Sequence, residues 1–169
     1  AGIGSRTACQ RGAMAGIVPA LVQVHVARPQ GGGWEHLVLR RSLQDHEYPG
    51  LWQCITGRVA EGETAFEAAQ RELDEEIGVA VHQWWSLPVV ASYYDRHYDM
   101  LRFAVAFGAV VPPSARVRLT EHEDYRWLDC SHAQQMLPIP AQQEGVALLD
   151  RFLTDPDRRG VLAQLYRLR

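Results

Sequence analysis

The chain contains no lysine, so all 17 of its basic side chains are arginines. The 20 acidic residues outnumber them, and the formal net charge is -3. This balance does not favour a protein that binds nucleic acid through a broad basic surface. It is compatible with a small phosphorylated ligand, because a few arginines suffice to bind phosphate groups. We therefore expect no nucleic-acid partner, and a small phosphorylated ligand is not excluded.

Cysteines and long apolar runs are also scarce. The three cysteines, Cys9, Cys54 and Cys130, are odd in number and widely spaced, so they form neither a disulfide framework nor a zinc-ligand pattern. A reduced, cytoplasmic setting is the expectation. No apolar run reaches the roughly 20 residues that span a bilayer, so no membrane partner is expected.

The length of 169 residues is typical of one domain. We expect residues 17–169 to form that domain. Residues 1–16 contain no acidic side chain and lack the apolar middle of a signal peptide. The expectation for them is a disordered leader.

Hydrophobic patterning indicates an α/β fold. It predicts strands at 18–27, 34–41, 51–56, 81–94 (broken at Pro88), 98–111 and 125–128, and helices at 65–77, 131–137, 142–153 and 158–168. Strands flanking one helix, with further helices closing the chain, predict a mixed β-sheet packed between helices, an α/β/α sandwich.

The helix at 65–77 has well-marked ends. Thr64 is placed to cap its N-terminus, and Glu67 three residues later completes a capping box. Gly78 stands where a helix favours a left-handed C-terminal residue. On this helix one apolar stripe faces the sheet, formed by Phe66, Ala69, Leu73 and Ile77.

Three carboxylates, Glu72, Glu75 and Glu76, crowd the edge of that stripe. Like charges one turn apart repel, and the helix dipole disfavours negative charge near the C-terminus. A hard divalent cation such as Mg²⁺ would offset both effects. The alternative is a solvated acidic face with Arg71 as its partner.

The whole segment GRVAEGETAFEAAQRELDEEIGV resembles the Nudix box, G-x5-E-x7-R-E-U-x-E-E-x-G-U, where U is bulky and aliphatic. All nine defined positions are filled: Gly57, Glu63, Arg71, Glu72, Leu73, Glu75, Glu76, Gly78 and Val79. The resemblance implies a Nudix-type α/β/α sandwich with a catalytic loop-helix, and an enzyme that hydrolyses a phosphoanhydride.

The resemblance also implies roles for individual residues. The metal, Mg²⁺ (or Mn²⁺), would be bound by Glu72, Glu75, Glu76 and the backbone carbonyl of Gly57 or Thr56. Arg71 would pair with Glu63 and tie the loop to the helix. The catalytic base would be Glu72, or Glu121 in an acidic loop at 119–123.

Two stretches, LWQCITGRVAEGET and LTEHEDYRWLD, look like one subgroup, the dihydroneopterin triphosphate pyrophosphatases. This likeness implies cleavage of a (deoxy)nucleoside or dihydroneopterin triphosphate into monophosphate and pyrophosphate. Leu119 departs from the aromatic residue expected there. Oxidised dGTP, a dinucleoside polyphosphate and ADP-ribose remain alternative substrates. A non-catalytic nucleotide-binding module is the alternative of another class, although such proteins usually lose a box glutamate.

Outside the box, Arg40, Trp52 and Gln53 are candidates for substrate binding. Arginine suits phosphate, and Trp52 and Gln53 could stack on or hydrogen-bond a base or pterin. The alternatives are a surface pair for Arg40 and Arg41, and burial in the core for Trp52. His25, within an apolar strand, is expected to be an interior histidine with satisfied nitrogens. Trp84 and Trp85 cannot both face one side of a strand, so one of them could mark a homodimer contact; a monomer is equally compatible with the sequence.

Overall fold

The computed structural model describes residues 18–96, 98–155 and 161–168. The leader predicted at 1–16 lies outside these residues, as does part of the helix predicted at 158–168. The elements in chain order are β1 (Leu21–Gln30), β2 (Gly33–Arg41), β3 (Trp52–Gln53), β4 (Ile55–Arg58), α1 (Ala65–Ile77), β5 (Gln83–Asp95), β6 (Met100–Val110), β7 (His122–Leu128), α2 (Cys130–Met136), α3 (Pro140–Thr154), α4 (Val161–Tyr166) and β8 (Arg167–Leu168).

Strand β1 organises a mixed sheet with the order β3-β2-β1-β6-β5-β8. One edge of β1 runs parallel to β6. The other edge is divided: its C-terminal part pairs antiparallel with β2, and its N-terminal part pairs antiparallel with β4. Strand β7 pairs with the far edge of β2. Val22 lies opposite Gly57, so the start of the box is fixed to the central strand.

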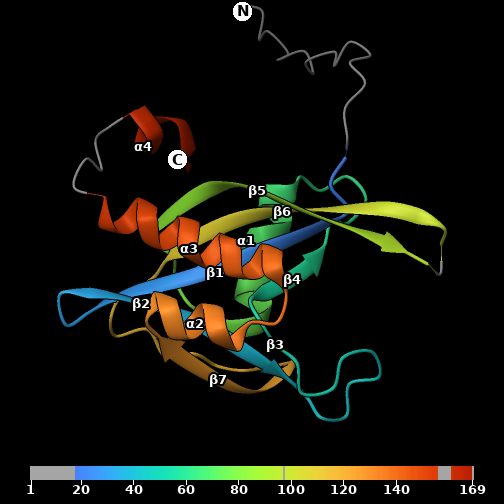
Figure 1. Cartoon of the computed structure of the whole chain (residues 1–169), viewed down its shortest axis with the longest axis horizontal. Coiled ribbons are helices and arrows are strands. Elements are labelled where there is room, and N and C mark those ends of the chain that lie inside the picture. Colours follow the sequence, from blue (N-terminus) through green and yellow to red (C-terminus); the bar gives the residue numbers. More distant parts are fainter. Residues whose placement is uncertain (1–17, 97, 156–160, 169) are drawn as a thin grey trace, which may run out of the picture.

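Helices cover both faces of this sheet. Helix α1 lies behind it and helices α2 and α3 lie in front, in the view of Figure 1. The core on the α1 face includes Val22, Leu39, Leu73 and Ile77, all nearly inaccessible to solvent. Leu149 and Phe152 of α3 pack on the other face. The predicted α/β/α sandwich is confirmed.

The two tryptophans of β5 belong to different layers. Trp84 lies edge-on against Phe66 of α1, with ring centroids 5.4 Å apart. Trp85 packs on Phe152 of α3 at 5.5 Å. Each layer of the sandwich takes one indole, because neighbouring strand residues point to opposite faces. Both indoles are thus accounted for by packing within the chain, and a dimer contact through one of them stays an untested prediction.

Most element boundaries follow the sequence pattern, with four differences. The strand expected at 51–56 is two short strands, and the second extends through Gly57 to Arg58. Pro88 does not break β5; the pairing with β6 shifts register there instead. The acidic loop expected at 119–123 is shorter, because β7 begins at His122. Helix α4 ends at Tyr166 and a two-residue strand follows, where helix was expected to 168.

His25 also differs from expectation. Its side chain is 1% exposed, but neither ring nitrogen has a hydrogen-bond partner among the described residues. Gly145 of α3 lies directly over the ring; a Cβ there would come within 2.1 Å of Nε2. The helix therefore packs too closely to bring a polar side chain to this histidine.

None of the helices in the described ranges is long and apolar enough to cross a membrane.

Candidate active site

Helix α1 presents the box glutamates as the sequence predicts, because both of its ends are fixed. The Thr64 hydroxyl accepts a hydrogen bond from the Glu67 backbone N–H, and the Glu67 carboxylate accepts one from the Thr64 N–H at 2.8 Å. At the other end Gly78 adopts a left-handed conformation with φ 59°. The predicted capping box and glycine cap are confirmed.

Glu72 lies directly against the backbone of Gly57. A Cβ on Gly57 would come 2.0 Å from Cδ of Glu72, far inside any allowed contact. Only glycine at position 57 lets this carboxylate reach the strand that carries Thr56 and Gly57. The backbone carbonyls predicted as metal ligands are thus next to a predicted carboxylate ligand.

Arg71 ties the box loop to the helix through five hydrogen bonds. Its guanidinium donates to both carboxylate oxygens of Glu63, at 2.9 and 3.0 Å, and to the backbone oxygen of Arg58 at 2.9 Å. It also donates to Glu72 at 2.7 Å and to Glu75 at 3.0 Å. Glu63 in turn accepts from the N–H of Ala60. The predicted Arg71–Glu63 pair is present, and the same guanidinium also binds Glu72 and Glu75, two predicted metal ligands.

Glu76 is the buried member of the group. Its side chain is 3% exposed, and its Oε2 has no hydrogen-bond partner among the described residues. Burial, together with the negative charges of Glu72 and Glu121, raises the pKa of Glu76 to about 9. Without a cation the group is therefore protonated at neutral pH, and ionising it here has a cost that a nearby cation would remove.

Two residues that sequence reasoning missed lie beside Glu76. The Nδ1 atom of His122 is 3.5 Å from its Oε2, and burial lowers the pKa of His122 to about 4. The positive charge of Arg41 counteracts the rise in the pKa of Glu76. Arg41 itself forms an ion pair with Asp45. The doublet Arg40–Arg41 was visible in the sequence, but a bulge between them decides which one faces Glu76.

Glu121 and Gln53 lie with these residues. The charge of Glu121 reaches Glu76, and the neighbouring Thr120 hydroxyl donates to the backbone oxygen of Glu75 at 2.7 Å. Gln53 is 4% exposed, and its amide nitrogen lies 3.1 Å from Nε2 of His122. Gln53 therefore positions His122 and has little surface left for a ligand.

Arg40 and Trp52 are not brought to the glutamates. They pair across β2 and β3, and Trp52 packs on the cluster around Val38 and Leu137, on the α2–α3 side. Arg126 stacks over the Trp52 ring at 5.2 Å. Nη1 of Arg40 lies 3.5 Å from Oε1 of Glu123. Strand alternation puts this face opposite to that of Gln53, so these two predicted substrate ligands are separated from the rest.

The residues around Glu76 fit a hard divalent cation. They offer three glutamates of α1, the carbonyls of β4 and an unpartnered buried oxygen, and Mg²⁺ is bound by oxygen ligands of this kind. Glu72 and Glu75 now accept hydrogen bonds from Arg71, so they would exchange that partner for the cation. Glu121 would supply a further negative charge.

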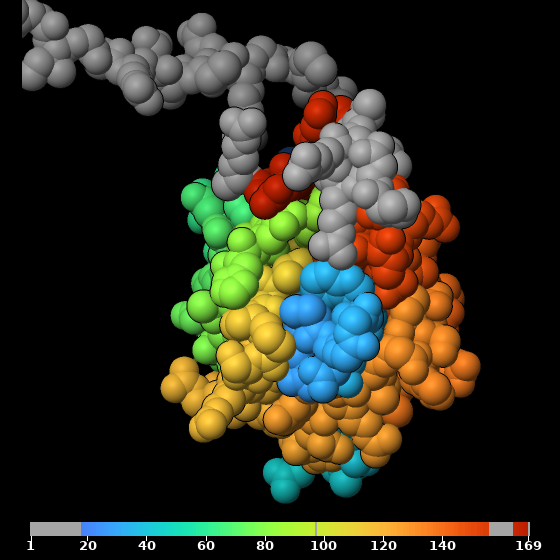
Figure 2. Space-filling model, turned by 90° about the vertical axis from the view of Figure 1, so that its left-hand side faces the viewer, coloured from blue at the N-terminus to red at the C-terminus, as the bar shows by residue number. Residues whose placement is uncertain are grey.

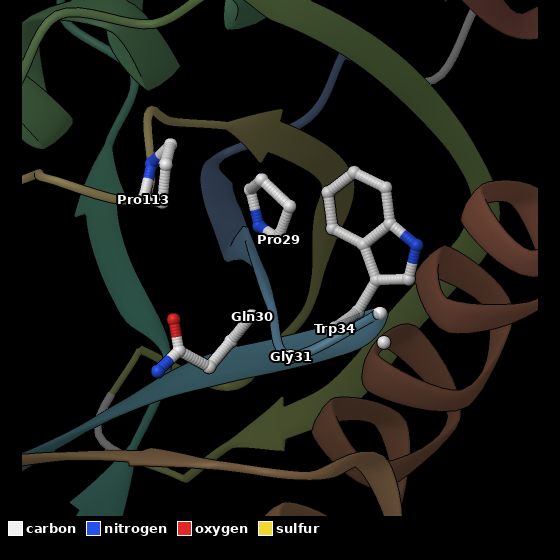
Figure 3. A pocket seen from close by; sticks show the side chains of 7 residues that line it. Pro29, Gln30, Gly31, Trp34 and Pro113 are labelled. Carbon is white, nitrogen blue, oxygen red and sulfur yellow. The ribbon is translucent and has the colours of Figure 1, made fainter.

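A separate hollow lies at the turn between β1 and β2. Figure 2 shows this end of the molecule, with the β1–β2 segment in blue between the chain that follows β6 and the C-terminal helices. Figure 3 shows Pro29, Trp34 and Pro113 around the glycine turn. Its lining contains no charged side chain, and it lies at the end of β1 opposite to the pairing with Gly57. It suits neither a metal nor a phosphate.

Known proteins resemble this chain in sequence. The chain is 34% identical over 103 residues to the dihydroneopterin triphosphate diphosphatase of Escherichia coli, covering 54% of this chain and 69% of that protein. It is 36% identical over 137 residues to an octanoyltransferase of Myxococcus xanthus, covering 76% of this chain. The chain spans only 36% of the length of that transferase, so the name describes a much longer protein.

A solved structure also resembles this one. A chain from Listeria monocytogenes assigned as a NUDIX hydrolase superposes with a TM-score of 0.70 at 25% identity, covering 82% of this chain and 97% of that one. The NUDIX domain family profile matches residues 19–152, which include every residue placed around Glu76. The complete box, the sandwich fold and these likenesses agree, and the chain belongs to the NUDIX domain family.

Proposed function

We propose that this chain is a divalent-metal-dependent pyrophosphohydrolase that cleaves a (deoxy)nucleoside or dihydroneopterin triphosphate into the monophosphate and pyrophosphate. The observation that carries the proposal is Glu76, a buried carboxylate with an unpartnered oxygen beside Glu72 and Glu121. A bound cation would stabilise the ionised form of Glu76 and so offset the free-energy cost of burying it. The likeness to the dihydroneopterin triphosphate diphosphatase supports the substrate class.

In this proposal Glu72, Glu75, Glu76 and the carbonyl of Gly57 would hold Mg²⁺ (or Mn²⁺). When bound, the cation would neutralise phosphate oxygens and lower the pKa of a bound water. Arg41 is placed to add positive charge beside the phosphates. Its charge already reaches Glu76, and Arg41 takes over the task that the sequence suggested for Arg40.

Glu121 is the better candidate for the general base. Glu72 already accepts a hydrogen bond from Arg71, whereas Glu121 is exposed and makes no side-chain hydrogen bond or ion pair with a described residue. A carboxylate oxygen of Glu121 would take the proton of the attacking water. The water oxygen would bond to phosphorus as the anhydride P–O bond breaks, and pyrophosphate would leave.

The substrate class is tested by separating and identifying the products formed from each compound with Mg²⁺ present, and by measuring pyrophosphate release from the triphosphates. Dihydroneopterin triphosphate, the four deoxynucleoside triphosphates, oxidised dGTP, a dinucleoside polyphosphate and ADP-ribose would be compared by kcat/KM. We expect a triphosphate to be preferred and to yield pyrophosphate rather than phosphate. If the wild type hydrolyses none of these compounds, the enzyme proposal is refuted and a binding module becomes the better description.

The base is tested by Glu121→Gln. We expect kcat to fall by about 10²- to 10⁴-fold with little change in KM, because general-base catalysis contributes rate enhancements of this size. Glu61→Gln is the matched control, an exposed glutamate in the loop before α1 that occupies no defined position of the box. An unchanged kcat for Glu121→Gln would return the base to Glu72.

A further inference from the structure

A second group of metal-binding atoms lies on the α2–α3 side of the sheet. His36 belongs to β2, Cys130 is the first residue of α2, and Asp150 belongs to α3. A ring nitrogen, the Sγ atom and a carboxylate oxygen of these residues all lie within 4.8 Å of one another. Three elements distant in sequence therefore bring nitrogen, sulfur and oxygen donors to one point.

His36 is the buried member of this group. Its side chain is 1% exposed, its Nε2 lies 3.1 Å from Oδ1 of Asp150, and its Nδ1 has no hydrogen-bond partner among the described residues. Nε2 is the nitrogen that faces Asp150, so it would be the ligand atom, whereas Nδ1 lies on the other side of the ring. A cation at this point would use imidazole and carboxylate as ligands, in place of the single hydrogen bond between them.

Cys130 lies in a negative field. Burial and the carboxylates of Asp150 and Asp129 raise the pKa of its thiol to about 11. Among the described residues, the only hydrogen-bond partner of the thiol is the amide oxygen of Gln134, 3.7 Å away, which is a weak contact. A thiol between two carboxylates is poorly placed to react as a nucleophile. The same two charges would attract a divalent cation and stabilise it once bound.

We propose that His36, Cys130 and Asp150 form a binding site for Zn²⁺ or a similar thiophilic divalent cation, separate from the box carboxylates. One nitrogen, one sulfur and one oxygen ligand suit tetrahedral Zn²⁺ and not Mg²⁺, which takes oxygen ligands alone. Cys130 and Asp150 are partly exposed, so water can enter and fill the fourth position. The bound ion would join β2 to α2 and α3.

The alternative is a buried His36–Asp150 hydrogen bond with a thiol nearby and no affinity for metal. Cobalt(II) distinguishes the two, because a cobalt–thiolate bond gives an intense near-ultraviolet charge-transfer band that oxygen ligands cannot produce. The full chain would be titrated with Co²⁺ after treatment with a chelator and a reductant. We expect the band to saturate at one equivalent and to disappear when Zn²⁺ is added.

Variants assign that band to the site. Cys130→Ser should abolish it, and Asp150→Asn should weaken Co²⁺ binding by more than about tenfold, an effect found even for groups that only support a metal ligand. Cys54→Ala is the control, since Cys54 is the other free thiol among the described residues and does not belong to this group. Glu76→Gln removes the box site and should leave the band intact.

The outcomes are distinct. Absence of the band in the wild type, or its survival in Cys130→Ser, overturns the proposal. Loss of the band in Cys54→Ala overturns it too, because the thiolate would then be elsewhere. As a second readout, Zn²⁺ should raise the Tm of the wild type and of Glu76→Gln but not of Cys130→Ser. An equal rise in all three would also count against the site.

Discussion

At the scale of single residues, the box is a set of close contacts around one buried carboxyl group, that of Glu76. Gly57 is needed because the Glu72 side chain lies against its backbone. Glu76 lowers the stability of the metal-free protein because it is buried near the charges of Glu72 and Glu121. The sequence motif alone shows neither the contact at Gly57 nor the burial of Glu76. Two substitutions measure these two effects separately.

Gly57→Ala should lower kcat by about 100-fold or more, because a methyl group would displace Glu72 from its place against β4, and small displacements in an active site have effects of this size. Stability should change little, since Glu72 is partly exposed and can swing outward. Gly62→Ala is the control for local backbone strain, since Gly62 has φ 81° and open space around it. Near-wild-type kcat in Gly57→Ala would show that Glu72 tolerates movement.

Glu76→Gln should raise the free energy of unfolding of the metal-free protein by about 2–3 kcal/mol at pH 7. The pKa of Glu76 is raised from 4.5 to about 9, so the folded protein keeps a proton that the unfolded chain releases. Below pH 4.5 Glu76 does not lower the free energy of unfolding, and it lowers this free energy progressively as the pH rises from 4.5 toward 9. Activity should disappear in the same variant.

Denaturant unfolding of this variant in the presence of a chelator measures the effect. Glu75→Gln is the control, because the Glu75 side chain is 59% exposed and should change stability little. Added Mg²⁺ should stabilise the wild type and reduce the difference from Glu76→Gln. Equal stability of wild type and Glu76→Gln without metal would contradict the burial cost.

At the scale of elements, α1 and its loop act as one rigid unit. Arg71 connects the loop at Glu63 with the helix at Glu72 and Glu75, and the capping box fixes where the helix starts. The unit is joined to the sheet through β4 on one side and through the segment that leads to β7 on the other. Positioning of the glutamates therefore depends on both ends of the helix.

Thr64→Ala should lower the free energy of unfolding by about 1 kcal/mol, the usual cost of an N-cap, and the Tm by about 2–4 °C. The fall in kcat should be no more than a few fold, because the carboxylates lie in the C-terminal half of α1. Thr64→Ser keeps the hydroxyl and should restore most of the stability. If Ser and Ala behave alike in thermal melts, the cap does not contribute.

The elements show what sequence could and could not predict. Helix α1 was predicted residue by residue, because a capping box, a periodic stripe and a terminal glycine all act locally. Assigning a face to Arg40 or Arg41 was not possible, because it depends on a bulge in the pairing of β2 with β7. The approach of His122 to Glu76 could not be predicted either, because it follows from the pairing of β7 with β2. The face of Trp52 was not predictable either, because it depends on the pairing of the two-residue β3 with β2.

At the scale of the whole molecule, buried titratable groups lie on both sides of the sheet. Glu76 belongs to the α1 face and His25 to the α3 face. Burial, with a smaller effect of His36, lowers the pKa of His25 to about 3. The two groups affect stability in opposite pH directions, and both effects come from desolvation.

His25→Leu should therefore stabilise the protein in mild acid. The unfolded histidine takes up a proton below pH 6.5, whereas the folded one stays neutral until about pH 3, so stability is lost as the pH falls through that range. At pH 5 the gain from His25→Leu should be about 2 kcal/mol. His46→Gln, a change at an exposed histidine, is the control. Parallel pH profiles for the wild type and His25→Leu would show that water or a proton reaches His25.

Glu76 also has a consequence for the lifetime of the protein in a cell. Without a cation, folding requires Glu76 to take up a proton, so the folded state is less stable when the proposed cation is scarce. A larger fraction of the chain is then unfolded, and proteases act on that fraction. The abundance of the protein would then follow the supply of magnesium, with no dedicated sensor. Glu76 would therefore bind the cation needed for activity and would shorten the lifetime of the protein when no cation is bound.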